Sequence, residues 1–512
     1  VPTHQYAAIT AALVTLAKLN YFCLPLWCVG TVFVFCTAEL LKKPYMKKLL
    51  ILLAFFGTVV KAQNLGFNGS GFFENYNAEV EQYLTDMNQP FTIRVPGGAI
   101  SKFHDPANVK KGWGMTEANV KTWFDKTGFD EDGNGYEKWL RKTEEQPNHS
   151  YLDDLIAMQK KFPNMQVLYV LNVLNSTPEK NMQAIRYLMQ NNVKVVGVEA
   201  GNEIYGKYAS FDEYVNDFEP IFAMLTKEYP SIKKGLVAGA NLGRKELVRW
   251  NESMAQYKGD YDAVIFHYYY TKNDLGEAYN MIPLRIKYDE NVTNKDLEKA
   301  YDKAAEVLLD KSMIERGVAY ARDLFGDKAI WITEWNTKPS EMLCNTILNG
   351  AWQFREMVEQ SEQVEYLLMH NGVSPDKYGM ISKGTYADSE NATMIRRTGY
   401  WAYILASEAQ GAQKLVKNEA PKMQVDDDGE ICIYFVNMDE AFNYALDLGK
   451  LKATSVTINY VSGKHLYSGS GMTGYMGKGT KPSYEVNGIK REKFTGTIPK
   501  NAFGYILIKT IK

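Results

Sequence analysis

The chain has 512 residues, of which 46% are hydrophobic and 23% are charged. This is the composition of a globular protein, so a disordered chain, a collagen-like fibre and a small disulfide-stapled domain are excluded. The 58 basic and 60 acidic side chains give a net charge of -2. Because the broad positive surface of a nucleic-acid-binding protein is missing, we expect no nucleic-acid partner.

The N-terminal region predicts export from the cell. A basic start at Met46 is followed by an apolar run over residues 49–60 and by small residues up to Ala62. This order is typical of a secretory signal peptide. We therefore predict an upstream, non-native segment over residues 1–45, a signal peptide over residues 46–62, and a secreted or periplasmic bacterial protein.

One alternative is a membrane anchor. Residues 7–40 are apolar apart from Lys18, and about 20 apolar residues suffice for a helix to cross a bilayer. On that alternative the protein is tethered and displayed outside the cell. The signal-peptide hypothesis instead predicts no stable membrane association after cleavage.

Cysteine usage agrees with a cut after Ala62. Three of the five cysteines precede it, which leaves Cys344 and Cys432. Two cysteines do not form a disulfide framework. Cys432 lies in an alternating apolar run and is predicted to be a small buried hydrophobic residue.

Short apolar runs alternate with longer stretches of helical period from about residue 75 to residue 410. One helix is predicted over residues 210–227, where Ser210 and Glu213 form a capping box. Such alternation is typical of βα units around a parallel sheet, and eight units predict an α/β fold, a (β/α)8 TIM barrel, over residues 63–411. The predicted strands are residues 64–67, 91–95, 166–172, 194–200, 234–240, 261–267, 329–334 and 364–370.

The region after residue 411 has a different pattern. Short alternating strands are separated by Gly, Asp and Asn turns, and long helical stretches are missing, which indicates a small β-sandwich domain over residues 412–512. The predicted strands are residues 423–425, 431–437, 455–460, 494–498 and 505–509.

Polar side chains end most of the predicted barrel strands. In a (β/α)8 barrel the carboxyl ends of the strands build the active site, whereas the interior is packed with branched side chains. We therefore expect these residues to converge at one mouth. They are Arg94, Asn172, Asn202, Glu203, His267, Glu334, His370 and Asn371.

Two glutamates stand out among them. Glu203 ends the fourth predicted strand and Glu334 ends the seventh, and these strands face each other across a barrel mouth. Glycoside hydrolysis needs such a pair, because one carboxyl protonates the leaving oxygen while the other attacks the anomeric carbon. A separation of about 5 to 5.5 Å is typical of retention of configuration.

These motifs resemble those of clan A glycoside hydrolases, most of all families 51, 39 and 79. The resemblance spans roughly residues 64–410. It rests on Asn202-Glu203, His267-Tyr268-Tyr269, Thr333-Glu334-Trp335-Asn336 and Arg94-Val95-Pro96-Gly97-Gly98.

The resemblance implies a role for each matched residue. Glu203 is implied as the acid/base and Glu334 as the nucleophile, with Asn202 bonding the sugar 2-hydroxyl beside it. Tyr269 is implied to orient the nucleophile, although its two tyrosine neighbours compete for the role. Arg94 is expected either to bind substrate or to pair with a structural carboxylate.

Other candidate substrate contacts come from the strand ends and loops. His267, Asn172 and His370 are polar strand ends. Sugar rings stack on aromatic platforms, and the loop aromatics Trp113, Trp335 and Phe103 are candidates, although covering the core would explain them equally well. The long insertions over residues 99–150 and 271–300 are expected to wall the cleft.

Residues 130–136 match the first half of a calcium loop. Position twelve is Arg141, where the bidentate glutamate should be, so a solvated Asn-Gly turn is the simpler account. A calcium site at residues 130–134 that distant carboxylates complete stays open. We predict no metal ion and no cofactor for the reaction.

Together these features predict a secreted retaining glycoside hydrolase that acts on plant or algal polysaccharides or oligosaccharides. One alternative is an agarase-, xylosidase- or glucanase-type member of the same clan. Another is a non-catalytic carbohydrate-binding protein on the same fold, which the presence of both glutamates disfavours.

Export predicts a processed N-terminus. If residues 46–62 are cleaved, the protein recovered from the medium or periplasm begins near Gln63, which Edman degradation or intact mass measures directly. Recovery in the membrane pellet with residues 7–40 still attached would support the anchored alternative.

Overall fold

The computed structural model describes the chain as segments of two units. The units are residues 1–63 and 64–512, and each is described by itself. The described residues are 25–28, 31–34, 65–69, 72–107, 111–128, 134–282, 295–310, 312–338, 341–344, 346–374, 378–383, 394–412, 414–417, 422–424, 429–447, 452–469, 484–491 and 495–511.

The first unit contains one described feature. Strands β1 (Pro25–Cys28) and β2 (Thr31–Val34) pair antiparallel, so the described part of residues 7–40 is strand rather than helix. The predicted signal peptide, residues 46–62, lies outside the described residues. Within the described parts of the chain, no helix has both the length and the apolar character needed to cross a bilayer.

The second unit is built on a closed barrel of eight parallel strands, which confirms the predicted TIM barrel. Strand neighbours follow chain order, and β10 closes the barrel against β3. The strands are β3 (Leu65–Asn68), β4 (Thr92–Val95), β5 (Gln166–Val170), β6 (Val195–Glu199), β7 (Lys233–Val237), β8 (Ala263–Tyr270), β9 (Ala329–Thr337) and β10 (Tyr366–Met369).

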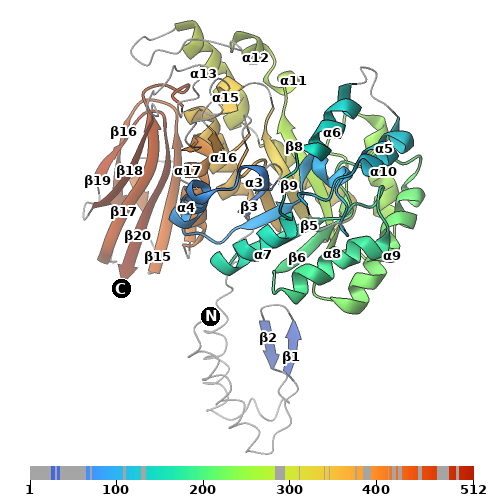
Figure 1. Cartoon of the computed structure of the whole chain (residues 1–512). Coiled ribbons are helices and arrows are strands. Elements are labelled where there is room, and N and C mark those ends of the chain that lie inside the picture. The colour runs from blue at the N-terminus through green and yellow to red at the C-terminus, as the bar shows by residue number, and fades with distance from the viewer. Residues whose placement is uncertain are drawn as a thin grey trace, which may run out of the picture. The chain divides into compact units, whose positions relative to one another are not determined.

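Helices connect the strands and surround the barrel (Figure 1). The helix predicted over residues 210–227 is α9, and its N-cap Ser210 accepts a hydrogen bond from the backbone N–H of Glu213. The helices after β3 to β6 are α3 (Phe72–Asn75), α4 (Ala78–Met87), the 3-10 helix η2 (Gly98–Lys102), α5 (Glu117–Thr127), α6 (Asn134–Glu144), α7 (Tyr151–Lys161), α8 (Pro178–Gln190) and α9 (Phe211–Glu228). Those after β7 to β10 are α10 (Lys245–Gln256), α11 (Lys272–Leu275), α12 (Glu277–Met281), α13 (Lys295–Asp310), α14 (Met313–Phe325), α15 (Glu341–Cys344), α16 (Ile347–Gln360) and α17 (Thr398–Gln410).

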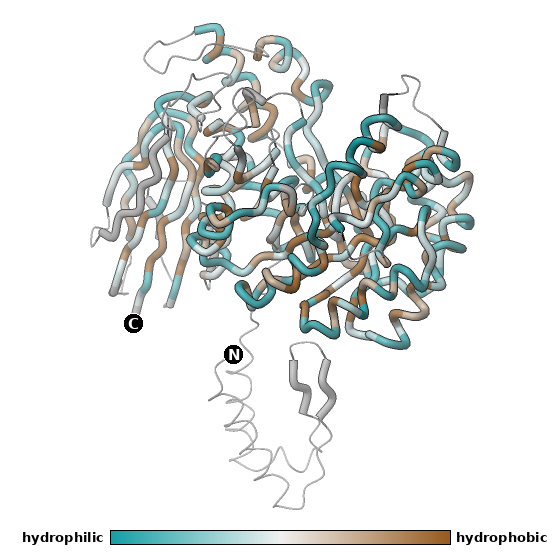
Figure 2. The backbone as a smooth tube through the Cα atoms, viewed as in Figure 1, coloured by the Kyte–Doolittle hydropathy of each residue, from teal (hydrophilic) through white to brown (hydrophobic). Residues whose placement is uncertain are grey.

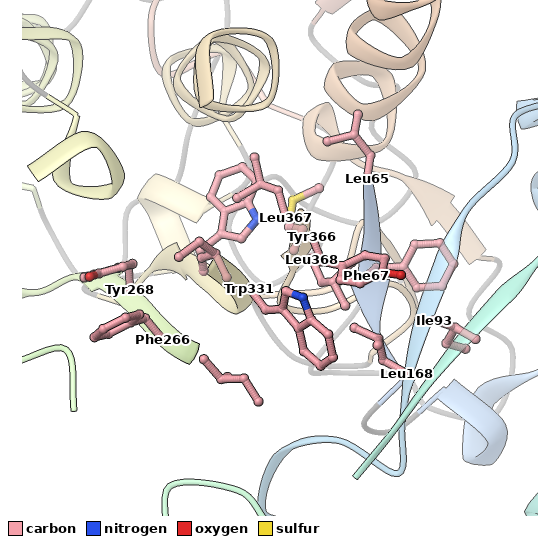
Figure 3. Close-up of a cluster of buried hydrophobic side chains, with 14 of the residues drawn as sticks. Leu65, Phe67, Ile93, Leu168, Phe266, Tyr268, Trp331, Tyr366, Leu367 and Leu368 are labelled. Atoms are coloured by element: carbon pink, nitrogen blue, oxygen red, sulfur yellow. The ribbon is translucent and has the colours of Figure 1, made fainter. Parts of the chain in front are cut away.

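The barrel interior is a packed core rather than a pore. Trp331 of β9 is fully buried, and Figure 3 shows it in a cluster with side chains from β3, β4, β5, β8 and β10. Two glycines leave room for its indole, since a Cβ added to Gly197 or to Gly235 would come within 2.7 or 2.8 Å of the ring. The Trp331 indole therefore occupies the space left by the absence of side chains at Gly197 and Gly235.

The C-terminal region consists of two facing sheets, as the alternating pattern predicts. One sheet has the order β13-β15-β20-β17-β18 and the other the order β14-β16-β19. Two short strands, β11 (Ile381–Lys383) and β12 (Met394–Arg396), form a separate pair before α17. The sandwich strands are β13 (Lys414–Lys417), β14 (Lys422–Gln424), β15 (Gly429–Asn437), β16 (Phe442–Asp447), β17 (Lys452–Gly463), β18 (Tyr484–Arg491), β19 (Thr495–Ile498) and β20 (Ala502–Ile511).

The larger sheet is buried on both faces. Ile431 and Ile433 of β15 belong to the core between the two sheets, whereas Cys432 and Tyr434 belong to the barrel core. This split follows from the two-residue period of a strand. Figure 2 shows apolar residues recurring along these strands and along the barrel strands. Cys432 is thus the buried hydrophobic residue that its pattern predicts, and both it and Cys344 are free thiols.

The sequence prediction misses three sandwich strands, β13, β16 and β18. In β18 the pair Asn487-Gly488 resembles a turn signal, yet Gly488 pairs with Asn459 in the middle of a regular ladder. The tertiary pairing overrides the local preference there.

The fit between Trp331 and Gly197 can be tested by mutation. We expect Gly197→Ala to lower the free energy of unfolding by about 1–3 kcal/mol, because the added methyl group overpacks the barrel. Combining it with Trp331→Phe should cost less than the sum of the single changes, since the smaller ring makes room. Urea denaturation of the four proteins measures this, and strict additivity would contradict the proposed contact.

Candidate active site

The predicted nucleophile Glu334 lies at the barrel mouth in a set of hydrogen-bond donors. Its Oε1 accepts hydrogen bonds from Asn68 Nδ2 (2.9 Å) and from an Arg94 guanidinium nitrogen (2.7 Å), and its Oε2 accepts one from the Tyr269 hydroxyl (2.7 Å). The side chain is buried. Three donors fix both oxygens of this carboxylate.

These surroundings hold Glu334 in its ionised form. Burial by itself would raise its pKa. The charges of His267, His370 and Arg94 and the hydrogen bond from Tyr269 outweigh that effect and hold the pKa well below its usual range. An ionised carboxylate at this position has the protonation state that a nucleophile needs.

A β-bulge aligns β8 with β9 at the site. Phe266 pairs with Ile332 but His267 pairs with Glu334, so Thr333 is the extra residue. His267 and Tyr269, two residues apart on β8, point to the same side of the strand, where Glu334 lies. The bulge thus brings both side chains to one carboxylate.

The neighbouring tyrosines point the other way. The Tyr268 ring lies against Gly317 of α14, where an added Cβ would come within 2.0 Å of its hydroxyl. The Tyr270 hydroxyl accepts a hydrogen bond from the backbone N–H of Met313. Among the three consecutive tyrosines, only Tyr269 bonds the predicted nucleophile.

His267 lies close to both glutamates. Its Nδ1 lies 3.1 Å from Glu203 Oε1 and 3.7 Å from Glu334 Oε2, and its Nε2 lies 3.2 Å from the Thr333 hydroxyl. Both ring nitrogens therefore have a hydrogen-bond partner, Glu203 on one side and Thr333 on the other. The ring does not line the cavity, so His267 is a positioning residue rather than the predicted substrate contact.

Glu203 follows β6 on a turn that Gly201 makes possible. Gly201 has φ +98° and Glu203 itself has φ 48°, a region that non-glycine residues rarely adopt. Its side chain is 35% exposed, against 5% for Glu334. Burial and the charge of Glu334 raise the pKa of Glu203, but the His267 hydrogen bond and charge and Lys102 outweigh them and lower it.

Arg94 forms the base of the site together with a residue that the sequence analysis missed. The Arg94 side chain is fully buried; its Nε donates to Glu199 Oε2 (2.8 Å), and its two terminal nitrogens donate to Glu334 and to Asn202 Oδ1 (2.8 Å). Of the two expectations for Arg94, the structure shows the pairing with a structural carboxylate, Glu199, rather than a side chain open to substrate. Glu199 is also fully buried, and a lone acid in an otherwise apolar strand is the signal that could have found it.

Asn202 presents its amide group to the cavity. A guanidinium only donates, so the atom that faces Arg94 is the amide oxygen, and the NH2 group remains for another acceptor. Asn202 lines the cavity. It can therefore donate a hydrogen bond to a substrate hydroxyl beside Glu334.

A cavity of about 430 Å³ lies over the two glutamates. Its walls come from η2, α6, the ends of β8 and β9 and the loop after β10, so the insertion over residues 99–150 does wall the cleft, whereas no described residue of 271–300 lines it. Its polar and aromatic lining residues are Lys102, Lys138, Trp139, Lys142, Asn202, Glu203, Tyr269, Glu334, Lys338, His370, Asn371, Ser374 and Tyr378.

The predicted sugar platforms do not lie in this cavity. Trp113, Trp335 and Phe103 are core side chains with at most 2% exposure, so no ring face is open to a sugar. Trp139 is the tryptophan on the wall, and its ring packs on Phe103 at 4.4 Å between centroids.

Asn172, a predicted substrate contact, instead bonds the protein backbone. Its Nδ2 donates to the His104 carbonyl (2.7 Å) and its Oδ1 accepts from the backbone N–H of Asn175 (3.1 Å), so both ends of the amide hold the loop after β5. His370 and Asn371 do line the cavity, and His370 Nδ1 lies 3.8 Å from Glu334 Oε2.

Three groups at the site have the chemistry of metal ligands. One carboxylate oxygen each from Glu203 and Glu334 and one nitrogen of His267 lie within 4.8 Å of one another. Glu334 already accepts hydrogen bonds from Arg94, Asn68 and Tyr269, and Glu203 is bonded to His267. This arrangement suits proton transfer. The half calcium loop at residues 130–134 lies outside the described residues apart from the first residue of α6.

Comparisons with known proteins identify the fold. No known family and no curated protein matches this sequence. Solved structures do match: the GH51 arabinofuranosidase from Xanthomonas axonopodis pv. citri has a TM-score of 0.53 and 13% identity over 88% of this chain and 96% of its own. The α-L-arabinofuranosidase from Thermotoga maritima has a TM-score of 0.50 and 13% identity, over 86% of this chain and 92% of its own. The family 51 α-L-arabinofuranosidase from Bifidobacterium longum has a TM-score of 0.51 and 10% identity, over 88% of this chain and 93% of its own. The chain thus shares the fold of clan A glycoside hydrolases.

The Arg94 network predicts a pH-dependent loss of stability in Arg94→Met. We expect the free energy of unfolding to fall by about 3–5 kcal/mol at pH 7, because two buried carboxylates lose their cation. In the wild type, the folded-state pKa of Glu334 lies below its unfolded value, so its stabilising contribution is present above about pH 4.3 and is lost as the pH falls towards the folded pKa. The difference in free energy of unfolding between the wild type and Arg94→Met should therefore be smaller at pH 3.5 than at pH 7.

Urea denaturation at both pH values measures that loss. Arg186→Met is the matched control, because Arg186 also contacts two carboxylates but lies on the surface, where ion pairs contribute little. Equal losses in the two variants would contradict the role of the buried network.

Proposed function

We propose that this protein is a retaining glycoside hydrolase with Glu334 as nucleophile and Glu203 as acid/base. The observation that supports it is the placement of the two carboxylates, which have oxygens within 4.8 Å of each other at the edge of one cavity. Retaining glycosidases have carboxyl groups about 5 to 5.5 Å apart, whereas inverting enzymes need about 6.5 to 9.5 Å for a water molecule.

In the first step Glu334 Oε2 or Oε1 attacks the anomeric carbon while Glu203 gives its proton to the leaving oxygen. The glycosidic bond breaks and a glycosyl ester forms on Glu334. In the second step Glu203 removes a proton from water, which attacks the same carbon and releases Glu334. Asn202, with its NH2 group turned to the cavity, would hold a sugar hydroxyl next to the reacting carbon.

The charge of Glu334 bears on the protonation of Glu203 in both steps. While Glu334 is ionised, its charge acts against the lowering of the Glu203 pKa by His267 and Lys102. When Glu334 becomes an ester that charge disappears, so the pKa of Glu203 falls and the residue is suited to act as a base.

A binding protein without catalysis is less consistent with this site. Keeping an ionised carboxylate buried requires the opposing charges and donors that surround Glu334. A sugar-binding surface needs no such group, because neutral hydroxyls are bound by amides and aromatic rings.

The substrate and location are part of the proposal. We propose a plant or algal polysaccharide or oligosaccharide as substrate, and export through residues 46–62. Solved structures that share this fold are named arabinofuranosidases. Agarase-, xylosidase- and glucanase-type activities are alternatives to test in the same assay.

The central test replaces the nucleophile. Glu334→Gln should abolish turnover, with about a 10⁴-fold or larger loss in kcat, because the amide cannot form the glycosyl ester. A panel of polysaccharides with a reducing-sugar readout measures turnover, and calorimetry should show that binding remains. Glu144→Gln, a surface change at the end of α6, serves as control. Wild-type turnover in Glu334→Gln would remove the nucleophile from the proposal.

A further inference from the structure

Four lysines line the cavity that holds the two glutamates. Lys102 lies at the end of η2, Lys138 and Lys142 lie on α6, and Lys338 follows β9. They outnumber the two carboxylates on the same lining, although the whole chain carries a net charge of -2. The cleft is therefore a positive region of a slightly negative protein.

The carboxylates of the site do not pair with three of these lysines, Lys102, Lys138 and Lys142. Glu334 already accepts bonds from Asn68, Arg94 and Tyr269, and Glu203 accepts one from His267. Among the described residues, Lys102, Lys138 and Lys142 form no ion pair within 4.0 Å. Burial lowers the pKa of Lys102, against the opposing effect of Glu203 and Glu334, which shows that its ammonium group has lost part of its water.

The arrangement on α6 is unfavourable without a partner. Lys138 and Lys142 are four residues apart, so they are neighbours on the helix surface, where like charges repel. Trp139 lies between them in sequence and on the cavity wall, with the Lys142 ammonium 5.9 Å from its ring centre. An aromatic ring and two ammonium groups on one cavity wall are suited to a sugar ring that carries a negative charge.

We propose that the substrate is an anionic glycan, with a carboxylate- or sulfate-bearing sugar unit bound by Trp139, Lys138 and Lys142. This inference rests on the proposed glycosidase function and adds the substrate class to it. The ring stacks on Trp139 while the two lysines, together with Lys102 on the same wall, neutralise the acidic group. Lys338, whose ammonium lies 4.7 Å from the ring centre of Tyr269, adds positive charge on the nucleophile side.

The test compares binding and turnover in three proteins. These are the wild type, Lys138→Gln/Lys142→Gln, and Arg141→Gln as a control that removes a positive charge from the same helix outside the cavity. Each is assayed with uronate-containing, sulfated and neutral oligosaccharides at two salt concentrations. Circular dichroism checks that the exposed helix is intact. Calorimetry is repeated in the Glu334→Gln background, so that binding is measured whether or not turnover occurs.

For the double variant we expect about a tenfold or greater loss of affinity for one charged class and a similar rise in KM, since charge-assisted bonds are removed. The loss should shrink at high salt, while kcat and neutral ligands change little. Preference for the uronate or the sulfated ligand identifies the acidic group. Arg141→Gln should behave like the wild type.

Three outcomes distinguish a failure of the anionic-substrate inference from a failure of the glycosidase proposal. Turnover of neutral glycans with equal efficiency, and no effect of the lysine changes, would overturn the anionic substrate and leave the glycosidase intact. If charged oligosaccharides bind through the α6 lysines but no glycan is cleaved, the binding inference stands and the catalytic proposal fails. Absence of binding to every charged ligand overturns the inference.

Discussion

One buried guanidinium joins the strand ends at the mouth of this barrel. Arg94 of β4 bonds Glu199 of β6, Glu334 of β9 and Asn202, so three strands from different sides of the mouth meet at one side chain. Two carboxylates buried close together would repel each other and take up protons. A cation between them, with donors in a fixed fork, lets both remain in place. The geometry of every other site residue depends on that arrangement.

The same network gives the two carboxylates of the proposed mechanism different surroundings. Glu334 is buried with three donors, whereas Glu203 is 35% exposed on a strained turn and bonds only His267 among the contacts described. Two titratable groups whose environments differ in this way are the usual basis for an acid and a nucleophile in one site. His267 touches both and keeps them at a fixed distance.

Much of this could be predicted from local sequence. The strand period and the polar residues after it mark the barrel and place Glu203, Glu334 and Asn202 at its mouth, because parallel strands share one carboxyl end. The role of Asn68 could not be found in this way, since its partner Glu334 is 266 residues away. Glu199 has a local signal, a lone acid in an apolar strand, but its partner Arg94 is 105 residues away. The local sequence does not distinguish a tryptophan in the core from one on a cleft wall, so it predicts Trp113 and Trp335 as platforms and misses Trp139 on α6.

The division between barrel and insertion explains how substrate choice can be independent of the chemistry. The strand ends supply the carboxylates and Arg94, whereas the lysines of α6 lie on a segment inserted between β4 and β5. An acidic substrate would be repelled by the ionised Glu334, so a barrel of this kind accepts one only if its loops add positive charge nearby. The excess of lysines on this wall meets that requirement, and it does so without altering the bonds that keep Glu334 ionised.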